Sequence, residues 1–153
     1  MHVQEHVPLR DLTTLKIGGT ARYFVSVATV EELADAVSFA RAQKLPLVIL
    51  GGGSNVLVAD GEIEAVVVKI DIRGIEWGYR GTDAEQEHAR PPKPQRRRGT
   101  NTELVVAGAG ENWDEIVAES VRRGLWGIEN LSGIPGTIGA APIQNIGAYG
   151  AEV

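Results

Sequence analysis

LPLVILGGGSN, from Leu45 to Asn55, is the stretch that decides the fold, because a short apolar run passes directly into three glycines. A nearly continuous apolar run of this length is typical of a parallel strand that is buried on both faces. Loops that follow such strands are where α/β proteins meet their ligands. The stretch therefore predicts a buried strand that ends at a binding loop.

The residues before this stretch predict a second strand and a helix. In ARYFVSVA (residues 21–28), apolar side chains recur at every second residue, and the segment is rich in β-branched and aromatic side chains, which indicates a strand. The alternation places three side chains on one face: Tyr23, Val25 and Val27. Thr29 is a candidate N-cap for a helix that ends near Gln43. Together with residues 45–50 these elements form a strand, helix and strand unit.

After the glycines the pattern predicts shorter strands and one more helix. The expected strands are NVLVA (55–59), AVVVKI (65–70), IEWGY (75–79) and TELVVAGAG (102–110). Asn112 is a plausible N-cap for a helix that closes at Gly124. The inner face of this helix is expected to carry Trp113, Ile116, Val117 and Ser120.

The stretch between residues 81 and 102 differs in composition from the rest of the chain. It has hardly any apolar residues, and it carries three prolines and five cations between Arg90 and Arg98. We expect a solvated, disordered insertion here. The basic part, 90–98, could also contact nucleic acid, but acidic residues precede it and no aromatic side chain interleaves it for stacking. We therefore expect no nucleic-acid partner.

The composition restricts the class of protein. A chain of 153 residues with 43% hydrophobic residues fits one domain or two small subdomains that share a core. The chain has no cysteine, which excludes disulfides and thiolate chemistry. It has three histidines, which disfavours a histidine metal cage, so we expect no metal. No apolar run suits a membrane span or a secretion signal, so we expect no membrane partner and a cytoplasmic protein.

The first glycine cluster, Gly51–Asn55, does not match the common nucleotide motifs. A Walker A loop needs a lysine where Ser54 stands, and the dinucleotide fingerprint needs a third glycine where Val56 stands. The cluster can still direct several backbone N–H groups and two short polar side chains at an anion. A tight turn between strands is the alternative, although two residues would suffice for a turn.

The second large cluster lies in SGIPGTIGAAPIQNIGAYGAEV, residues 132–153. Gly133, Gly136 and Gly139 recur at every third residue, and Gly147 and Gly150 repeat the spacing. Backbone of this kind suits close contact with a planar heterocycle, whose edge it can hydrogen-bond. A buried irregular loop that packs against the sheet is the alternative, and the residue types alone do not separate the two.

Four segments carry a family resemblance: LTTLKIGGTARYF, VILGGGSNVLVAD, GAGENWDEIV and LSGIPGTIGAAPIQNIGAYGAEV. In this order and spacing they resemble the first part of the bacterial UDP-N-acetylenolpyruvoylglucosamine reductases, over about Leu12 to Val153. The resemblance implies an α+β fold of the vanillyl-alcohol-oxidase (PCMH) type that binds FAD. It implies a small βαβ subdomain over 1–55 and a second, incomplete subdomain over 56–153. The insertion at 81–102 is the main departure from the family pattern.

The resemblance also implies which residues contact the cofactor. The FAD pyrophosphate would be held by Gly51, Gly52, Gly53, Ser54 and Asn55. Gly108, Ala109 and Gly110 would lie beside the cofactor. The ribityl chain and the isoalloxazine would be lined by Gly133, Ile134, Pro135, Gly136, Gly139, Gln144, Asn145, Gly147 and Ala148. Tyr149 would reach toward the substrate.

In the family, NADPH reduces the flavin, and the reduced flavin passes hydride to the enolpyruvyl double bond of a UDP-sugar. The product, UDP-N-acetylmuramate, is a precursor of peptidoglycan, so the resemblance implies a role in cell-wall synthesis, cell shape and division.

The family's catalytic residues are an arginine, a serine and a glutamate that follow the GAYG motif. By the resemblance all three would lie beyond Val153, so no residue of this chain is expected to be catalytic. We expect a fragment without the substrate domain that shows no turnover alone. We also expect a monomer, although apolar surface where the missing domain would dock could make the fragment self-associate.

Two alternatives stay open at this stage. A different flavin oxidoreductase of the same fold would keep a GGGSN-like loop but should lack the NIGAYG segment. A non-enzymatic flavin or nucleotide module, or a scaffold that uses the basic loop, would bind polyanions tightly through Arg96, Arg97 and Arg98, in a manner that salt weakens, and flavin binding would be absent.

Overall fold

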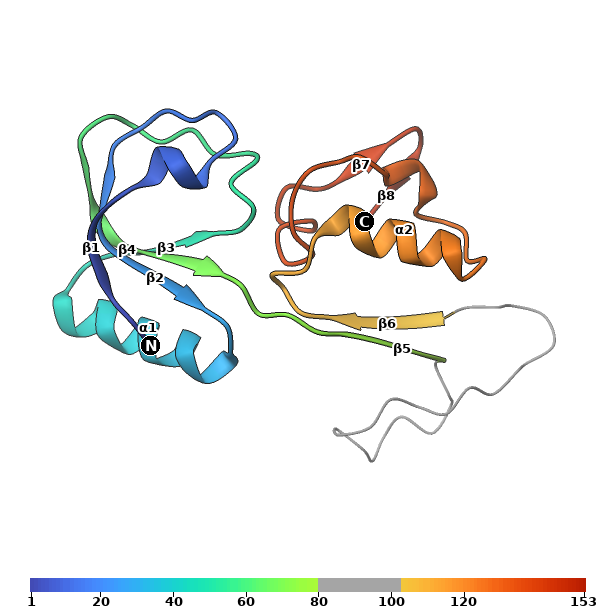
Figure 1. Cartoon of the computed structure of the whole chain (residues 1–153), viewed down its shortest axis with the longest axis horizontal. Coiled ribbons are helices and arrows are strands. Elements are labelled where there is room, and N and C mark those ends of the chain that lie inside the picture. The colour runs from blue at the N-terminus through green and yellow to red at the C-terminus, as the bar shows by residue number, and fades with distance from the viewer. Residues whose placement is uncertain (80–102) are drawn as a thin grey trace.

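The protein, described by a computed structural model over residues 1–79 and 103–153, has an α+β architecture. Two groups of elements lie side by side, and the chain passes from the first to the second through residues 71–74 (Figure 1). The predicted insertion at 81–102, with its basic stretch, lies outside the described residues. Within the described ranges, none of the helices is both long and apolar enough to cross a membrane.

The first group is a four-stranded sheet with helix α1 (Val30–Gln43) on one face (Figure 1). The strand order is β1 (Gln4–Pro8), β2 (Thr20–Val27), β4 (Glu62–Ile70) and β3 (Leu47–Leu50). Both β2 and β3 run parallel to β4, whereas β1 is antiparallel to β2. The predicted N-cap is confirmed, because the Thr29 hydroxyl accepts the Glu32 amide at 3.2 Å. A short 3₁₀ helix, η1 (Leu9–Leu12), packs on the opposite face.

Strand β4 lies at the centre of the core of this group, and its residues 65–68 are all buried. Val66 and Val68 pack toward α1, together with Val25 and Val27 of β2. Val67 packs toward the other face, in a cluster that also holds Leu9, Ala21, Phe24 and Leu50. The alternation predicted for residues 21–28 is confirmed, since Val25 and Val27 share one face.

Two sequence predictions about this sheet are wrong. The strand over 45–50 is not buried on both faces, because β4 inserts between β2 and β3 and leaves β3 at the sheet edge, with Val48 43% and Ile49 53% exposed. The segment 55–59 is not a strand. It runs past the loop before β2, where the Gly19 amide donates to the Ala59 carbonyl at 2.9 Å, and the parallel ladder between β2 and β4 begins only at Thr20 and Glu62.

The second group begins with β5 (Ile75–Tyr79), which pairs with β6 (Glu103–Ala107), and continues into α2 (Trp113–Arg122). The remaining elements are η2 (Glu129–Leu131), β7 (Gly147–Ala148) and β8 (Ala151–Glu152). Their core contains Trp113, Val117, Leu131, Ala141 and Ile146. The four residues predicted for the inner face of α2 are all buried, and Asn112 caps the helix as expected.

The sheet pairing bears on where the two groups divide. A boundary between residues 55 and 56 would separate β3 from β4, which are hydrogen-bonded neighbours in one sheet. We propose that the division lies after Ile70, where β4 ends and the chain leaves toward β5.

Candidate functional site

The glycine cluster that follows β3 faces the glycine-rich loop near residue 136. The Ser54 hydroxyl donates to the Pro135 carbonyl at 3.2 Å, although the two residues are 81 positions apart in sequence. A methyl group added at Gly52 would lie 3.4 Å from the Gly136 Cα. The two clusters that the sequence singled out therefore line the same cleft.

A short segment after η1 holds the first cluster in place. The Thr14 amide donates to the Gly53 carbonyl at 2.9 Å. Gly53 adopts a φ of +68°, and a Cβ there would lie 2.1 Å from the Leu12 carbonyl oxygen. Only glycine fits this contact without displacing backbone, so the segment from Leu12 to Thr14 determines where the cluster lies.

The middle cluster, residues 108–110, connects the exit of β4 to the second loop. The Gly108 amide donates to the Gly74 carbonyl at 2.8 Å, and the Gly110 amide donates to the Ile72 carbonyl at 2.9 Å. On its other side, the Ala109 carbonyl accepts the Gly139 amide at 2.9 Å. Residues 108–110 thus lie between the β4 exit and the second glycine-rich loop and are hydrogen-bonded to both.

Two cavities open on either side of the first cluster. The larger has a volume of about 700 Å³ and is bordered by charged and polar groups as well as by glycines. The second, of about 550 Å³, is lined mainly by apolar groups. Both volumes lie in the range of about 300–1,000 Å³ that is usual for ligand sites. The residues shared by both linings are Gly51, Gly52, Ser54, Ile70 and Thr137.

The predicted site residues divide into two sets. The first set lines one or both cavities: Gly51, Gly52, Gly53, Ser54, Asn55, Ala109, Gly110, Pro135, Gly136, Gly139 and Gln144. The second set lines neither: Gly108, Gly133, Ile134, Asn145, Gly147, Ala148 and Tyr149. Ile134 and Ala148 pack against the core of the second group instead, and Tyr149 is 90% exposed.

Val153, beyond which the family's catalytic residues are expected, also lies away from both cavities. Its amide donates to the Ile146 carbonyl at 3.1 Å, so the backbone here packs against the second group, while half of the residue's surface is exposed. Val153 therefore offers no group to the cleft. That this chain carries none of the catalytic residues stays a prediction.

Several lining residues were not predicted. Three are cations at the larger cavity, Lys16, Lys69 and Arg73, and three are carboxylates of the same lining, Asp11, Asp71 and Glu115. Ile49, Val56 and Ile143 supply apolar surface to the smaller cavity. Lys16 lies in the segment LTTLKIGGTARYF, which carries part of the family resemblance, so the sequence contained a signal for it. Lys69 has no such signal, since a lysine near the end of a strand is common.

The cations differ in how they are paired. Within the described residues, Lys16 and Lys69 form no ion pair, although the Lys16 ammonium lies 3.4 Å from the Asp11 carbonyl. Arg73 is held by the Asp71 carboxylate through Nε at 3.0 Å and Nη2 at 2.9 Å. These hydrogen bonds to Asp71 raise the pKa of Arg73 above its usual value, and a weaker contribution comes from Glu111.

A second carboxylate fixes the start of the loop at 132–139. Asp114, in the first turn of α2, accepts the Gly133 amide at 2.7 Å and the Ser132 hydroxyl at 2.9 Å. The Gly133 amide, followed by the Ser132 hydroxyl, lowers the pKa of Asp114, because both hydrogen bonds favour the ionised form.

The arrangement can bind an anion next to a planar apolar group. Within the described parts of the chain, no acceptor occupies the amides of Gly52, Gly53, Ser54 or Asn55. Clustered backbone amides of this kind form concave sites for phosphates, and two unpaired lysines border the same cavity. The apolar cavity on the other side of the cluster suits a ring system.

Comparison with known proteins supports this assignment of chemistry. The model of the family described as "FAD binding domain" matches residues 21–89 and 93–153. UDP-N-acetylenolpyruvoylglucosamine reductase of Saccharopolyspora erythraea is 46% identical over 141 residues, which is 92% of this chain and 34% of the relative. The enzyme of that name from Ralstonia nicotianae is 40% identical, over 97% of this chain and 39% of the relative.

A solved structure gives the same result. The crystal structure of UDP-N-acetylenolpyruvylglucosamine reductase (MurB) from Thermus caldophilus superimposes with a TM-score of 0.66 and 31% sequence identity. The match covers 99% of this chain and 45% of that chain. The chain thus spans between a third and a half of the length of the relatives it matches.

Proposed function

Because this chain belongs to the FAD binding domain family, we propose that its two cavities hold FAD, with the cluster Gly51–Asn55 against the pyrophosphate. The observation that carries the proposal is the contact between the two glycine-rich loops, through Ser54 and Pro135, with a cavity on each side of it.

The residues present fit the chemical groups of FAD. The amides of residues 52–55 would donate to the phosphate oxygens, and Lys16 and Lys69 would balance their charge. Ile49, Val56 and Ile143 would cover a ring and exclude water from it. Gln144, whose amide nitrogen lies beside Gly136, would orient the polar edge of that ring. FAD, when bound, supplies the capacity to accept and release a hydride.

We further propose that this part serves an NADPH-dependent reductase that acts on UDP-N-acetylenolpyruvoylglucosamine in peptidoglycan precursor synthesis. Support comes from the names of the relatives, which are reductases of this UDP-sugar. A cytoplasmic location belongs to the same proposal, because the substrate would be a soluble nucleotide sugar, and we propose a monomer with it. Tyr149, which lines neither cavity and is 90% exposed, would reach toward the substrate side of the ring.

The test is FAD retention by the purified chain. The protein is mixed with FAD, desalted and examined by visible absorption, and the affinity is then measured by flavin fluorescence titration. We expect a retained, structured flavin band at about one FAD per chain, and weaker retention of FMN, which lacks the pyrophosphate. A folded but colourless protein would overturn the proposal.

Substitution of the cations provides a second readout. Replacing both Lys16 and Lys69 by methionine should weaken FAD binding and reduce the salt dependence of the affinity, because two positive charges leave the phosphate site. Lys44, which follows α1 and lines neither cavity, gives the control variant Lys44→Met, whose affinity should equal that of the wild type.

A further inference from the structure

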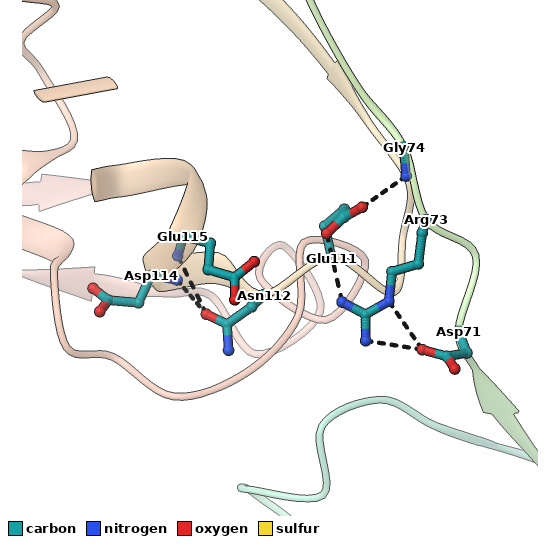
Figure 2. A network of polar contacts seen from close by, with 7 residues as sticks. All are labelled: Asp71, Arg73, Gly74, Glu111, Asn112, Asp114 and Glu115. Atoms are coloured by element: carbon teal, nitrogen blue, oxygen red, sulfur yellow. Dashed lines mark hydrogen bonds and ion pairs between the residues drawn. The ribbon is translucent and has the colours of Figure 1, made fainter. Parts of the chain in front are cut away.

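Among the residues whose side chains the structure describes, Glu111 is the one charged residue that is buried, with 8% of its surface exposed. Its carboxylate accepts the Gly74 amide at 2.7 Å through Oε1 and lies 3.5 Å from the Arg73 guanidinium through Oε2 (Figure 2). Burying a carboxylate costs free energy unless hydrogen bonds and an opposite charge compensate. Both kinds of partner here come from one segment, which leads from β4 into β5.

The backbone of Glu111 contacts two other segments. Its amide donates to the Gly108 carbonyl at 3.0 Å, and its carbonyl accepts the Ile138 amide at 2.9 Å. One residue therefore joins three pieces of chain: the β4 exit at 71–74, the middle cluster at 108–110 and the second glycine-rich loop at 136–139. The side chain itself does not line either cavity, whereas its partner Arg73 lines the larger one.

These contacts bear on the position of the second loop relative to β4. The first glycine cluster follows β3, which is fixed to β4 by parallel pairing, and the Asp71 amide at the end of β4 donates to the Val27 carbonyl at 2.9 Å. The second loop is joined to the β4 exit through residues 108–111, and it also contacts the first cluster directly through the hydrogen bond from Ser54 to Pro135. The Glu111 carboxylate is the side-chain contact that fixes this connection to the β4 exit.

We propose that Glu111 is a positioning residue, which holds the two glycine-rich loops at the separation that the cofactor requires. This inference rests on the proposed function for its ligand, but the contact network exists without the ligand. Loss of the carboxylate would leave the Gly74 amide without its acceptor, so that only the backbone hydrogen bonds from Gly108 and Gly110 would hold the β4 exit against residues 108–111. Arg73 would keep Asp71 as a partner, so the change would be local.

The test compares Glu111→Ala with Glu111→Gln. The glutamine variant keeps an oxygen that can accept the Gly74 amide, so we expect its FAD dissociation constant to stay within about threefold of the wild type. The alanine variant should bind FAD at least about tenfold more weakly. Glu119→Ala is the matched control, because Glu119 pairs with the exposed Arg122 and Arg123 and lines neither cavity. Its affinity should not change.

Amide hydrogen exchange in the absence of FAD gives an independent readout. In Glu111→Ala, the amides of Gly74, Ile138 and Gly139 should exchange faster, whereas amides in α1 should not. A wild-type chain that fails to bind FAD would overturn the proposed function, and the exchange rates would then still decide the role of Glu111. Equal FAD affinity in Glu111→Ala and wild type would overturn the positioning role, as would unchanged exchange at Ile138 and Gly139.

Glu111→Asp decides the question if the alanine variant does not fold. The aspartate keeps the charge beside Arg73, but its side chain is one methylene shorter and cannot reach the Gly74 amide unless the backbone moves. We expect its FAD affinity to fall below that of the glutamine variant, with faster exchange at Gly74. An aspartate variant that matches the glutamine variant in both measurements would overturn the positioning role.

Discussion

Replacement of Gly53 by alanine tests whether the segment after η1 determines the position of the first glycine cluster. The backbone φ of +68° already disfavours a side chain, at a cost of about 1–2 kcal/mol. The new methyl would lie 2.1 Å from the Leu12 carbonyl oxygen, whereas carbon to oxygen contacts are usually about 3.3 Å or longer. The backbone must therefore shift by about 1 Å. That shift would break the hydrogen bond from the Thr14 amide to the Gly53 carbonyl, whose loss would cost about 0.5–1.5 kcal/mol more of stability.

Gly124→Ala is the matched control for this substitution. Gly124 has a φ of +70°, nearly the same as Gly53, but a Cβ there would meet nothing within 4 Å. We expect Gly124→Ala to lower the free energy of unfolding by about 1–2 kcal/mol. Gly53→Ala should lower it by about 2–4 kcal/mol, since strain of the contact and loss of one hydrogen bond are added.

Urea denaturation followed by circular dichroism measures the difference. With an m value of about 2 kcal/mol/M, an excess loss of about 1.5 kcal/mol moves the midpoint of Gly53→Ala about 0.75 M below that of Gly124→Ala. Equal midpoints in the two variants would refute the reasoning, because they would show that the contact with Leu12 carries no energy beyond the cost of the backbone conformation.

Three other predictions concern the second group of elements. Because hydrogen bonds from Gly133 and Ser132 lower the pKa of Asp114, the stability it contributes is present above the unfolded value of about 3.9 and is lost as the pH falls through the folded value. Thermal unfolding from about pH 6 to about pH 3 should therefore show a steeper loss for wild type than for Asp114→Asn, and parallel curves would contradict this. Trp113→Phe should cost about 1–3 kcal/mol, measured by urea denaturation, because the buried Leu131 carbonyl loses the indole donor at 2.9 Å. Leu131→Ala should cost about 2–5 kcal/mol in the same assay, since its side chain is fully buried, and a loss below about 1 kcal/mol would mean that the site is not core.

Helices were the part of the fold that the sequence predicted best, and α2 shows why. Its N-cap, its inner face and its end are all encoded within one short segment, and the Asn112 side chain accepts the amides of Asp114 and Glu115 at 2.8 and 3.3 Å. Capping and helical periodicity are local effects, so a single segment contains the information that they need. The same holds for α1 and Thr29.

Strand positions were harder to predict because they depend on pairing between distant segments. The runs at 47–50 and 65–68 are both apolar throughout, yet β4 is buried and β3 is an edge strand. Which run occupies the centre is decided by the order in which strands join the sheet, and that order is not a property of either run. An exposed apolar residue on an edge strand is usually covered by another group. Ile49 lines the proposed cofactor cavity, so the cofactor would cover it.

The candidate site shows the same division between local and distant information. Glycine spacing was sufficient to predict that residues 51–55 and 133–139 are shaped for close approach, and the structure brings residues of both into one cleft. Spacing could not separate glycines that face a ligand from glycines that face other backbone. A Cβ at Gly108 would lie 2.3 Å from the Ile72 carbonyl oxygen, so chain packing alone accounts for that glycine.

Glu111 explains why this packing matters for the site. A buried carboxylate beside glycines gives no distinctive sequence pattern, since its partners at 73 and 74 are far away in the chain. The close approach that Gly108 and Gly110 permit is what brings Glu111 within reach of the Gly74 amide. The middle cluster is thus best understood as the connection between the two loops: its glycines allow contact with the β4 exit, and the carboxylate that follows them fixes it. Substitutions in this cluster should therefore change cofactor affinity through the width of the cleft, even at positions that never contact the cofactor.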